Sequence, residues 1–96
     1  MLTSKQRAKL RALANPIDTI LQIGKGGVGD QLITQVKDAL TARELIKLRA
    51  LETCPLSVKE AANVLAEATG SEVVQVIGTK LVLYKRNPKE PKIELE

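Results

Sequence analysis

A glycine-rich segment, Gly24-Lys-Gly-Gly-Val-Gly29, divides two stretches of the chain that differ in apolar periodicity. The seven residues before it, 17–23, are rich in β-prone side chains and form a short run, which is typical of a strand. After it, apolar residues recur at helical spacing at Leu32, Ile33, Val36, Ala39 and Leu40. The segment is therefore predicted to be a loop from a strand into a helix that ends near Arg43.

Capping signals place two further helices. Thr3 and Gln6 have the spacing of a capping box, and so do Ser57 and Glu60. The first helix is predicted to end near residue 14, before Asn-Pro, and the other to end at Gly70.

Alternating and β-prone runs predict strands over 44–51, 72–77 and 80–85. The resulting α-β-α-β-α-β-β order predicts an α/β fold with four strands and three helices. Strands joined by a helix are expected to run parallel where they are neighbours, and the last strand antiparallel to the third. In the strand over 44–51, Lys47 and Arg49 are expected on the hydrated face.

Length and composition limit the chain to one domain without obvious catalytic chemistry. Residues 1–86 are predicted to form the domain and residues 87–96 a mobile charged tail. Phe and Trp are absent, so Leu, Ile, Val and Ala must build the core, with Tyr84 as the one aromatic. Cys54 is the sole cysteine and there is no His, which argues against a disulfide, a zinc site and Cys-His catalysis. We expect a cytoplasmic protein that is not an enzyme, has no cofactor or metal, and has no signal peptide or membrane span.

The charge distribution favours a polyanionic partner. Residues 1–50 hold nine Lys and Arg against four Asp and Glu, whereas residues 51–96 hold six against seven. A localised basic excess attracts nucleic acid, but a merely solvated basic surface explains the same count.

The glycine segment admits two nucleotide-binding interpretations. It matches the start of a phosphate-binding P-loop, but Asp30 and Gln31 stand where that motif needs Lys and Ser or Thr. Its glycines also fit G-x-G-x-x-G, with Glu44 twenty residues after Gly24. However, the ribose-binding acid belongs near the end of the second strand, and a lone match is weak.

A third interpretation is a clamp for a nucleic-acid backbone. Gly24-Lys25-Gly26-Gly27 is a G-x-x-G sequence, the type of loop that clamps nucleotides in KH domains. Glycines allow close approach of a phosphate, main-chain N–H groups and the helix N-terminus bind it, and Lys25 adds charge. A purely structural turn remains open from these residues alone.

Three segments in order resemble the CRM (chloroplast RNA splicing and ribosome maturation) domain, and more narrowly the stand-alone bacterial YhbY-type proteins. They are Thr19-Ile-Leu-Gln-Ile-Gly-Lys-Gly-Gly-Val28, Ala39-Leu-Thr-Ala-Arg-Glu-Leu-Ile-Lys-Leu48 and Gln75-Val-Ile-Gly-Thr-Lys-Leu-Val-Leu-Tyr-Lys-Arg86. The resemblance implies a four-stranded mixed sheet with three helices, similar to the C-terminal domain of translation initiation factor three. It also implies binding to RNA, in particular to precursors of the large ribosomal subunit. Gly29 and the Thr79-Lys80 pair depart from the family pattern.

Together these observations predict a monomeric ribosome-assembly factor that binds precursor large-subunit rRNA and possesses no catalytic activity. The alternatives are a nucleotide-binding module that uses the Gly24–Gly29 loop and a protein-interaction module that docks on ribosomal proteins. Tyr84 is expected in the core, so the shortage of exposed aromatics favours recognition of RNA backbone over bases. The predicted RNA-binding residues are Gly24, Lys25, Gly26, Gly27, Arg7, Lys9, Arg11, Lys47, Arg49 and Lys80.

Overall fold

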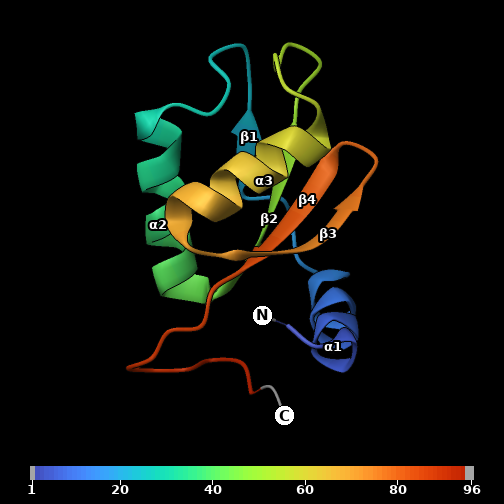
Figure 1. The fold of residues 1–96 in the computed structure, drawn as a ribbon, viewed down its shortest axis with the longest axis vertical. Helices are drawn as coiled ribbons and strands as arrows, with labels where there is room; N and C mark the ends of the chain where they lie inside the picture. Colours follow the sequence, from blue (N-terminus) through green and yellow to red (C-terminus); the bar gives the residue numbers. More distant parts are fainter. Residues whose placement is uncertain (1, 95–96) are drawn as a thin grey trace.

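Three helices and four strands follow one another along the chain in the predicted order (Figure 1). A computed structural model describes residues 2–94. Its elements are α1 (Ser4–Ala14), β1 (Leu21–Ile23), α2 (Asp30–Arg43), β2 (Leu45–Ala50), α3 (Val58–Thr69), β3 (Glu72–Ile77) and β4 (Lys80–Tyr84). The α/β class, three helices and four strands predicted from the sequence are confirmed.

The strands form one mixed sheet in the order β1-β2-β4-β3. The helix-connected neighbours β1 and β2 run parallel, while β4 lies antiparallel to both β2 and β3. Both predicted strand directions are therefore correct, and β4 inserts between β2 and β3. Its register sets Arg49 opposite Lys80, and the register of β1 sets Gln22 opposite Arg49.

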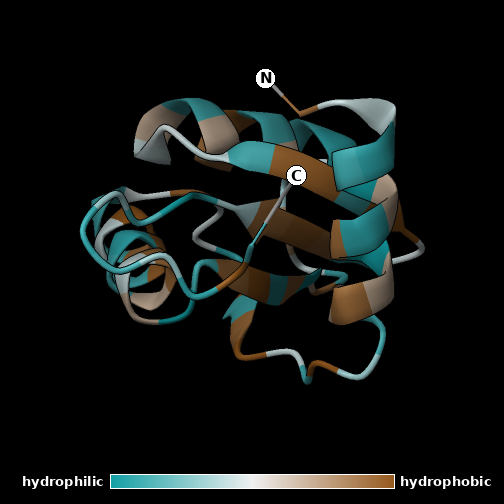
Figure 2. Ribbon diagram, turned by 90° about the horizontal axis from the view of Figure 1, so that it is seen from below, coloured by the Kyte–Doolittle hydropathy of each residue, from teal (hydrophilic) through white to brown (hydrophobic). Residues whose placement is uncertain are grey.

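Each face of the sheet carries its own apolar cluster, because side chains alternate along a strand. On one face, α2 and α3 pack over a cluster of Ile23, Val36, Leu40, Ile46, Leu48, Ala61, Ala62, Leu65, Leu81 and Leu83. On the other face, Leu10 and Ala14 of α1 form a second cluster with Leu45, Val74, Val82 and Tyr84 of the sheet. Figure 2 shows apolar residues concentrated in the central strands, with hydrophilic residues along the outer loops and the tail.

The predicted helix caps are confirmed. The Thr3 hydroxyl accepts from the Gln6 N–H at 3.1 Å and the Ser57 hydroxyl from the Glu60 N–H at 3.1 Å, and both capping boxes are complete. Gly70 ends α3 in a left-handed conformation, φ 68°. None of the helices within residues 2–94 combines the length and the apolar character needed to cross a bilayer.

The first strand is shorter than predicted, since only residues 21–23 are extended in the sheet. Ile17 contacts the cluster beneath α1, whereas Ile20 contacts the cluster on the opposite face. The Ile17 N–H donates to the Ala14 carbonyl at 3.0 Å, so Ile17 belongs to the turn after α1, and the paired register with β2 begins only at Leu21.

Glu44 follows the last residue of α2 and is fully buried with φ 65°, rather than being the first residue of a strand. Its carboxylate accepts three main-chain N–H groups from the C-terminal segment, at 2.6 Å from Asn87, 2.6 Å from Lys92 and 2.8 Å from Ile93. Burial by itself would raise the pKa of Glu44, but these three hydrogen bonds and the charge of Lys92 hold that pKa below its usual value.

The C-terminal segment contacts the body of the domain at several points. Ile93 packs against the cluster beneath α1, and the Lys9 ammonium donates to the Glu94 carbonyl at 2.5 Å. The mobility predicted for residues 87–96 stays a prediction; residues 87–94 have these contacts, and residues 95 and 96 lie outside the described residues.

Tyr84 is buried against α1, as predicted, at 4% exposure. Burial, followed by the nearby negative charge of Glu44, raises the pKa of its hydroxyl.

Candidate nucleic-acid interface

The glycine segment forms a tight turn at one end of the long axis of the molecule (Figure 1). The Gly27 N–H donates to the Gly24 carbonyl at 3.0 Å, which closes a four-residue turn with Lys25 and Gly26 at its corner. Both corner residues are exposed. The turn thus presents an ammonium group and an uncovered stretch of main chain to solvent.

Among the glycines at positions 24, 26, 27 and 29, only Gly27 is required by the backbone. Gly27 has φ 65°, and a Cβ there would lie 3.1 Å from the Pro55 Cγ. Gly26 and Gly29 lack a positive φ, and a Cβ on either would meet nothing within 4 Å. Their lack of side chains therefore serves no packing need within the fold, and it leaves room for a ligand to approach the main chain.

The first turn of α2 differs from those of the other two helices. Gly29 is its N-cap, and no side chain caps it, whereas Thr3 and Ser57 cap α1 and α3. The first N–H groups of a helix have no partner within the helix, so this end of α2 presents donors and the positive end of the helix dipole. Asp30 is the acidic residue of that first turn and opposes an incoming anion.

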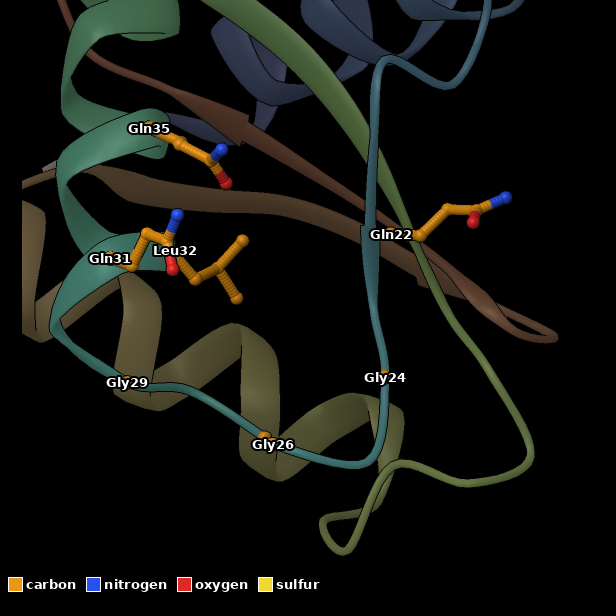
Figure 3. A pocket seen from close by; sticks show the side chains of 8 residues that line it. Gln22, Gly24, Gly26, Gly29, Gln31, Leu32 and Gln35 are labelled. Carbon is orange, nitrogen blue, oxygen red and sulfur yellow. The ribbon is translucent and has the colours of Figure 1, made fainter.

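A hollow of about 380 Å³ lies between the turn, β1 and the first two turns of α2 (Figure 3). It is lined by the glycines at positions 24, 26, 27 and 29 and by Gln22, Gln31, Leu32 and Gln35. The side chains of Gln31 and Gln35 reach from α2 toward β1, whereas the side chain of Gln22 points away from α2. Sequence reasoning did not single out Gln22 or Gln35, because a lining position depends on how β1 and α2 are placed in space.

The structure brings three of the predicted basic residues onto one face of the sheet. Lys47, Arg49 and Lys80 share the face that carries α1, as the register with Val82 shows. Arg49 and Lys80 are exposed, lie directly opposite each other and belong to the end of the sheet near the glycine turn. Like charges at such a cross-strand pair repel each other, and an anion between them would relieve that repulsion.

The basic residues of α1 lie elsewhere. Figure 1 shows α1 at the end of the molecule opposite the glycine turn, so the proximity in sequence of Arg7, Lys9 and Arg11 to the loop is not a proximity in space. The Arg7 guanidinium donates to the Val73 carbonyl, and the Lys9 ammonium is held by the Glu94 carbonyl. Arg11 is exposed.

Glu44 is not placed to serve a dinucleotide at the glycine loop. It follows the C-terminus of α2, so the whole fourteen-residue helix separates it from the glycine loop. Its carboxylate already accepts three N–H groups.

The sheet order, the three helices and the turn between β1 and α2 define a small α/β domain with a glycine loop at one end. The chain belongs to the CRS1/YhbY (CRM) domain family, whose model matches residues 2–85. This confirms the resemblance found in the sequence.

Two relatives and one solved structure match along almost their whole length. The chain is 44% identical over 95 residues to "Probable RNA-binding protein YqeI" of Bacillus subtilis, which covers 99% of each chain. It is 31% identical to an RNA-binding protein of Haemophilus influenzae, over 98% of this chain and 94% of the relative. The solution structure of SAV1595 from Staphylococcus aureus is similar with a TM-score of 0.84 and 49% identity, over 100% of both chains.

Proposed function

We propose that the protein binds RNA without catalysing a reaction, and that it acts as an assembly factor on precursor rRNA of the large ribosomal subunit. The Gly24–Gly27 turn holds the RNA backbone. The observation that carries this proposal is the turn itself, where exposed Lys25, unobstructed main chain and the uncapped start of α2 meet at one end of the molecule. The names of the Bacillus and Haemophilus relatives support RNA as the partner.

The contact extends from the turn onto the sheet. Gln22 lies two residues before Gly24 and is paired with Arg49, which in turn faces Lys80. A phosphate-bearing strand that leaves the turn along this row meets two further cations. The basic residues of α1 serve RNA only if it continues to the far end of the molecule, and Arg7 and Lys9 would first have to leave their carbonyl partners.

Salt dependence measures this contact. If Lys25, Arg49 and Lys80 each neutralise one phosphate of single-stranded RNA, the logarithm of the binding constant falls with the logarithm of salt concentration with a slope of about −2. A tenfold increase in salt then weakens binding about 100-fold.

The test compares the wild type with the double variant Lys25→Asp and Gly26→Asp on a precursor large-subunit rRNA fragment across a salt series. We expect the wild type to show the slope and the folded double variant to lose most of its affinity. A matched control carries Lys37→Asp and Thr41→Asp, which change the net charge equally on exposed positions of α2 farther from the turn. Equal binding by the wild type and the loop variant would eliminate the turn as the clamp. Binding to assembled particles that survives the loop substitutions would instead favour a protein-docking role.

A further inference from the structure

The hollow beside the glycine turn has a chemistry different from that of the turn. All its lining residues are uncharged: four glycines, three glutamines and Leu32. A phosphate gains most from cations and main-chain N–H groups, so the side-chain amides of α2 are not explained by phosphate binding. They donate and accept hydrogen bonds in equal measure, which suits a neutral polar group.

Two of these amides are positioned as a pair. Gln31 and Gln35 are four residues apart on α2 and therefore share one helix face, and both side chains reach toward β1 (Figure 3). Both residues are exposed, and neither amide group is hydrogen-bonded to another group of residues 2–94. Their donors and acceptors are therefore available to a ligand in the hollow.

The opposite wall adds main-chain groups. β1 is an edge strand, and the Ile23 carbonyl accepts from the Leu51 N–H toward β2 at 2.9 Å. Main-chain groups alternate in direction along a strand, so those of Gln22 are directed to the open edge, which borders the hollow. Leu32 provides an apolar contact at the α2 side.

We propose that an unpaired nucleobase of the bound RNA enters this hollow and is hydrogen-bonded by the Gln31 and Gln35 amides and by the main chain of Gln22. The inference rests on the proposed function, because the RNA backbone must first be held at the turn. Gly24 and Gly27 belong to both the turn and the hollow, so a nucleotide with its phosphate at the turn can direct its base between β1 and α2. The volume of about 380 Å³ is at the lower end of the range for small-ligand sites and suits one base.

From the sequence, we expect the protein to recognise the RNA backbone rather than the bases. A base in this hollow would add discrimination between bases. Base edges differ in their patterns of donors and acceptors, and glutamine reads such edges well in other complexes. Because the hollow is open to solvent, we expect a preference of about five- to tenfold among bases, at the lower end of what a paired amide contact provides.

The experiment measures the binding of four short homopolymeric oligoribonucleotides, and of an abasic oligomer of the same length, at one salt concentration. The wild type is compared with a Gln31→Met, Gln35→Met variant, which keeps side-chain length, charge and helix propensity. Gln75→Met is the matched control, since Gln75 belongs to β3, at the sheet edge opposite β1 and away from the hollow. We expect the wild type and the control to prefer one base over the others and over the abasic oligomer, and the double variant to bind all five equally.

Two results would overturn the inference: equal binding of all five oligomers by the wild type, or an unchanged preference in the double variant. Failure of the proposed function looks different, because the wild type would then bind no RNA or would bind it without dependence on Lys25 and salt.

Discussion

The two ends of α2 differ in whether nearby main-chain N–H groups have an acceptor within the protein. Beyond its C-terminus, the chain supplies its own anion, because the buried Glu44 carboxylate accepts three N–H groups of the C-terminal segment. Before its N-terminus, Gly29 has no side-chain cap and the turn is open to solvent. The same kind of donor is satisfied internally at one end and left for an external acceptor at the other. The difference separates a structural anion site from the proposed ligand site.

Replacement of the internal anion gives the largest expected effect. Glu44→Ala leaves three N–H donors without their acceptor, so we expect the free energy of unfolding to fall by about 2–3 kcal/mol. Urea denaturation measures it, with Glu90→Ala on the exposed tail as the control. RNA affinity of the folded protein should not change. If Glu44→Ala weakened RNA binding by the folded protein, the two ends would not be independent.

Acid should weaken the same end of the molecule. The pKa of Glu44 is lower in the folded chain than its usual value of 4.5, so its stabilisation is complete above that value and is lost as pH falls through the folded pKa. The difference in unfolding free energy between the wild type and Glu44→Gln should therefore be constant near neutral pH and shrink below about pH 4.5. If the difference in unfolding free energy did not vary with pH, the negative charge of Glu44 would not contribute to stability.

A pair of glycine substitutions distinguishes backbone need from ligand access at the other end. Gly27→Ala forces alanine into φ 65° beside Pro55, which should cost about 1–2 kcal/mol of stability. Gly26→Ala meets no atom and should leave stability unchanged or raise it by about 0.4–1 kcal/mol, while it weakens RNA binding by obstructing the main chain. Thermal unfolding and RNA titration of both variants provide the comparison. Full RNA affinity in Gly26→Ala would show that bare main chain at this position is not used.

The smallest effect concerns Asp30 in the first turn of α2. Asp30→Asn removes a negative charge close to the proposed phosphate site, so RNA affinity at low salt should rise about two- to fivefold. Asp38→Asn, on the same helix but farther from the turn, is the control and should leave the affinity nearly unchanged. An equal gain in both variants would indicate net charge rather than position.

Local signals were sufficient for most of the fold. The capping residues Thr3 and Ser57 and the apolar spacing after Gly29 each act within a few positions, so the helices could be predicted well. The start of β1 could not, because β propensity does not reveal that the Ile17 N–H is used by the turn after α1.

For the candidate site, the sequence predicted the turn and the shared face of Lys47 and Arg49, because both follow from neighbouring residues. It did not predict the position of α1 relative to the turn, which depends on the face of the sheet that Leu10 covers. The role of Glu44 was also hidden, since its partners lie more than forty positions away and contribute main-chain groups that no side-chain pattern reports.

The way the C-terminal segment is attached to Glu44 limits which substitutions that segment can accept. Glu44 recognises N–H groups, so most side chains at positions 87, 92 and 93 are compatible with the attachment, and proline, which lacks the N–H, is not. Pro88 and Pro91, which have no N–H, lie at positions that donate nothing to the carboxylate. Among relatives, we therefore expect the sequence of this segment to vary and its prolines to occur at different positions, but not at the positions equivalent to 87, 92 and 93. The glutamate equivalent to Glu44 should be invariant.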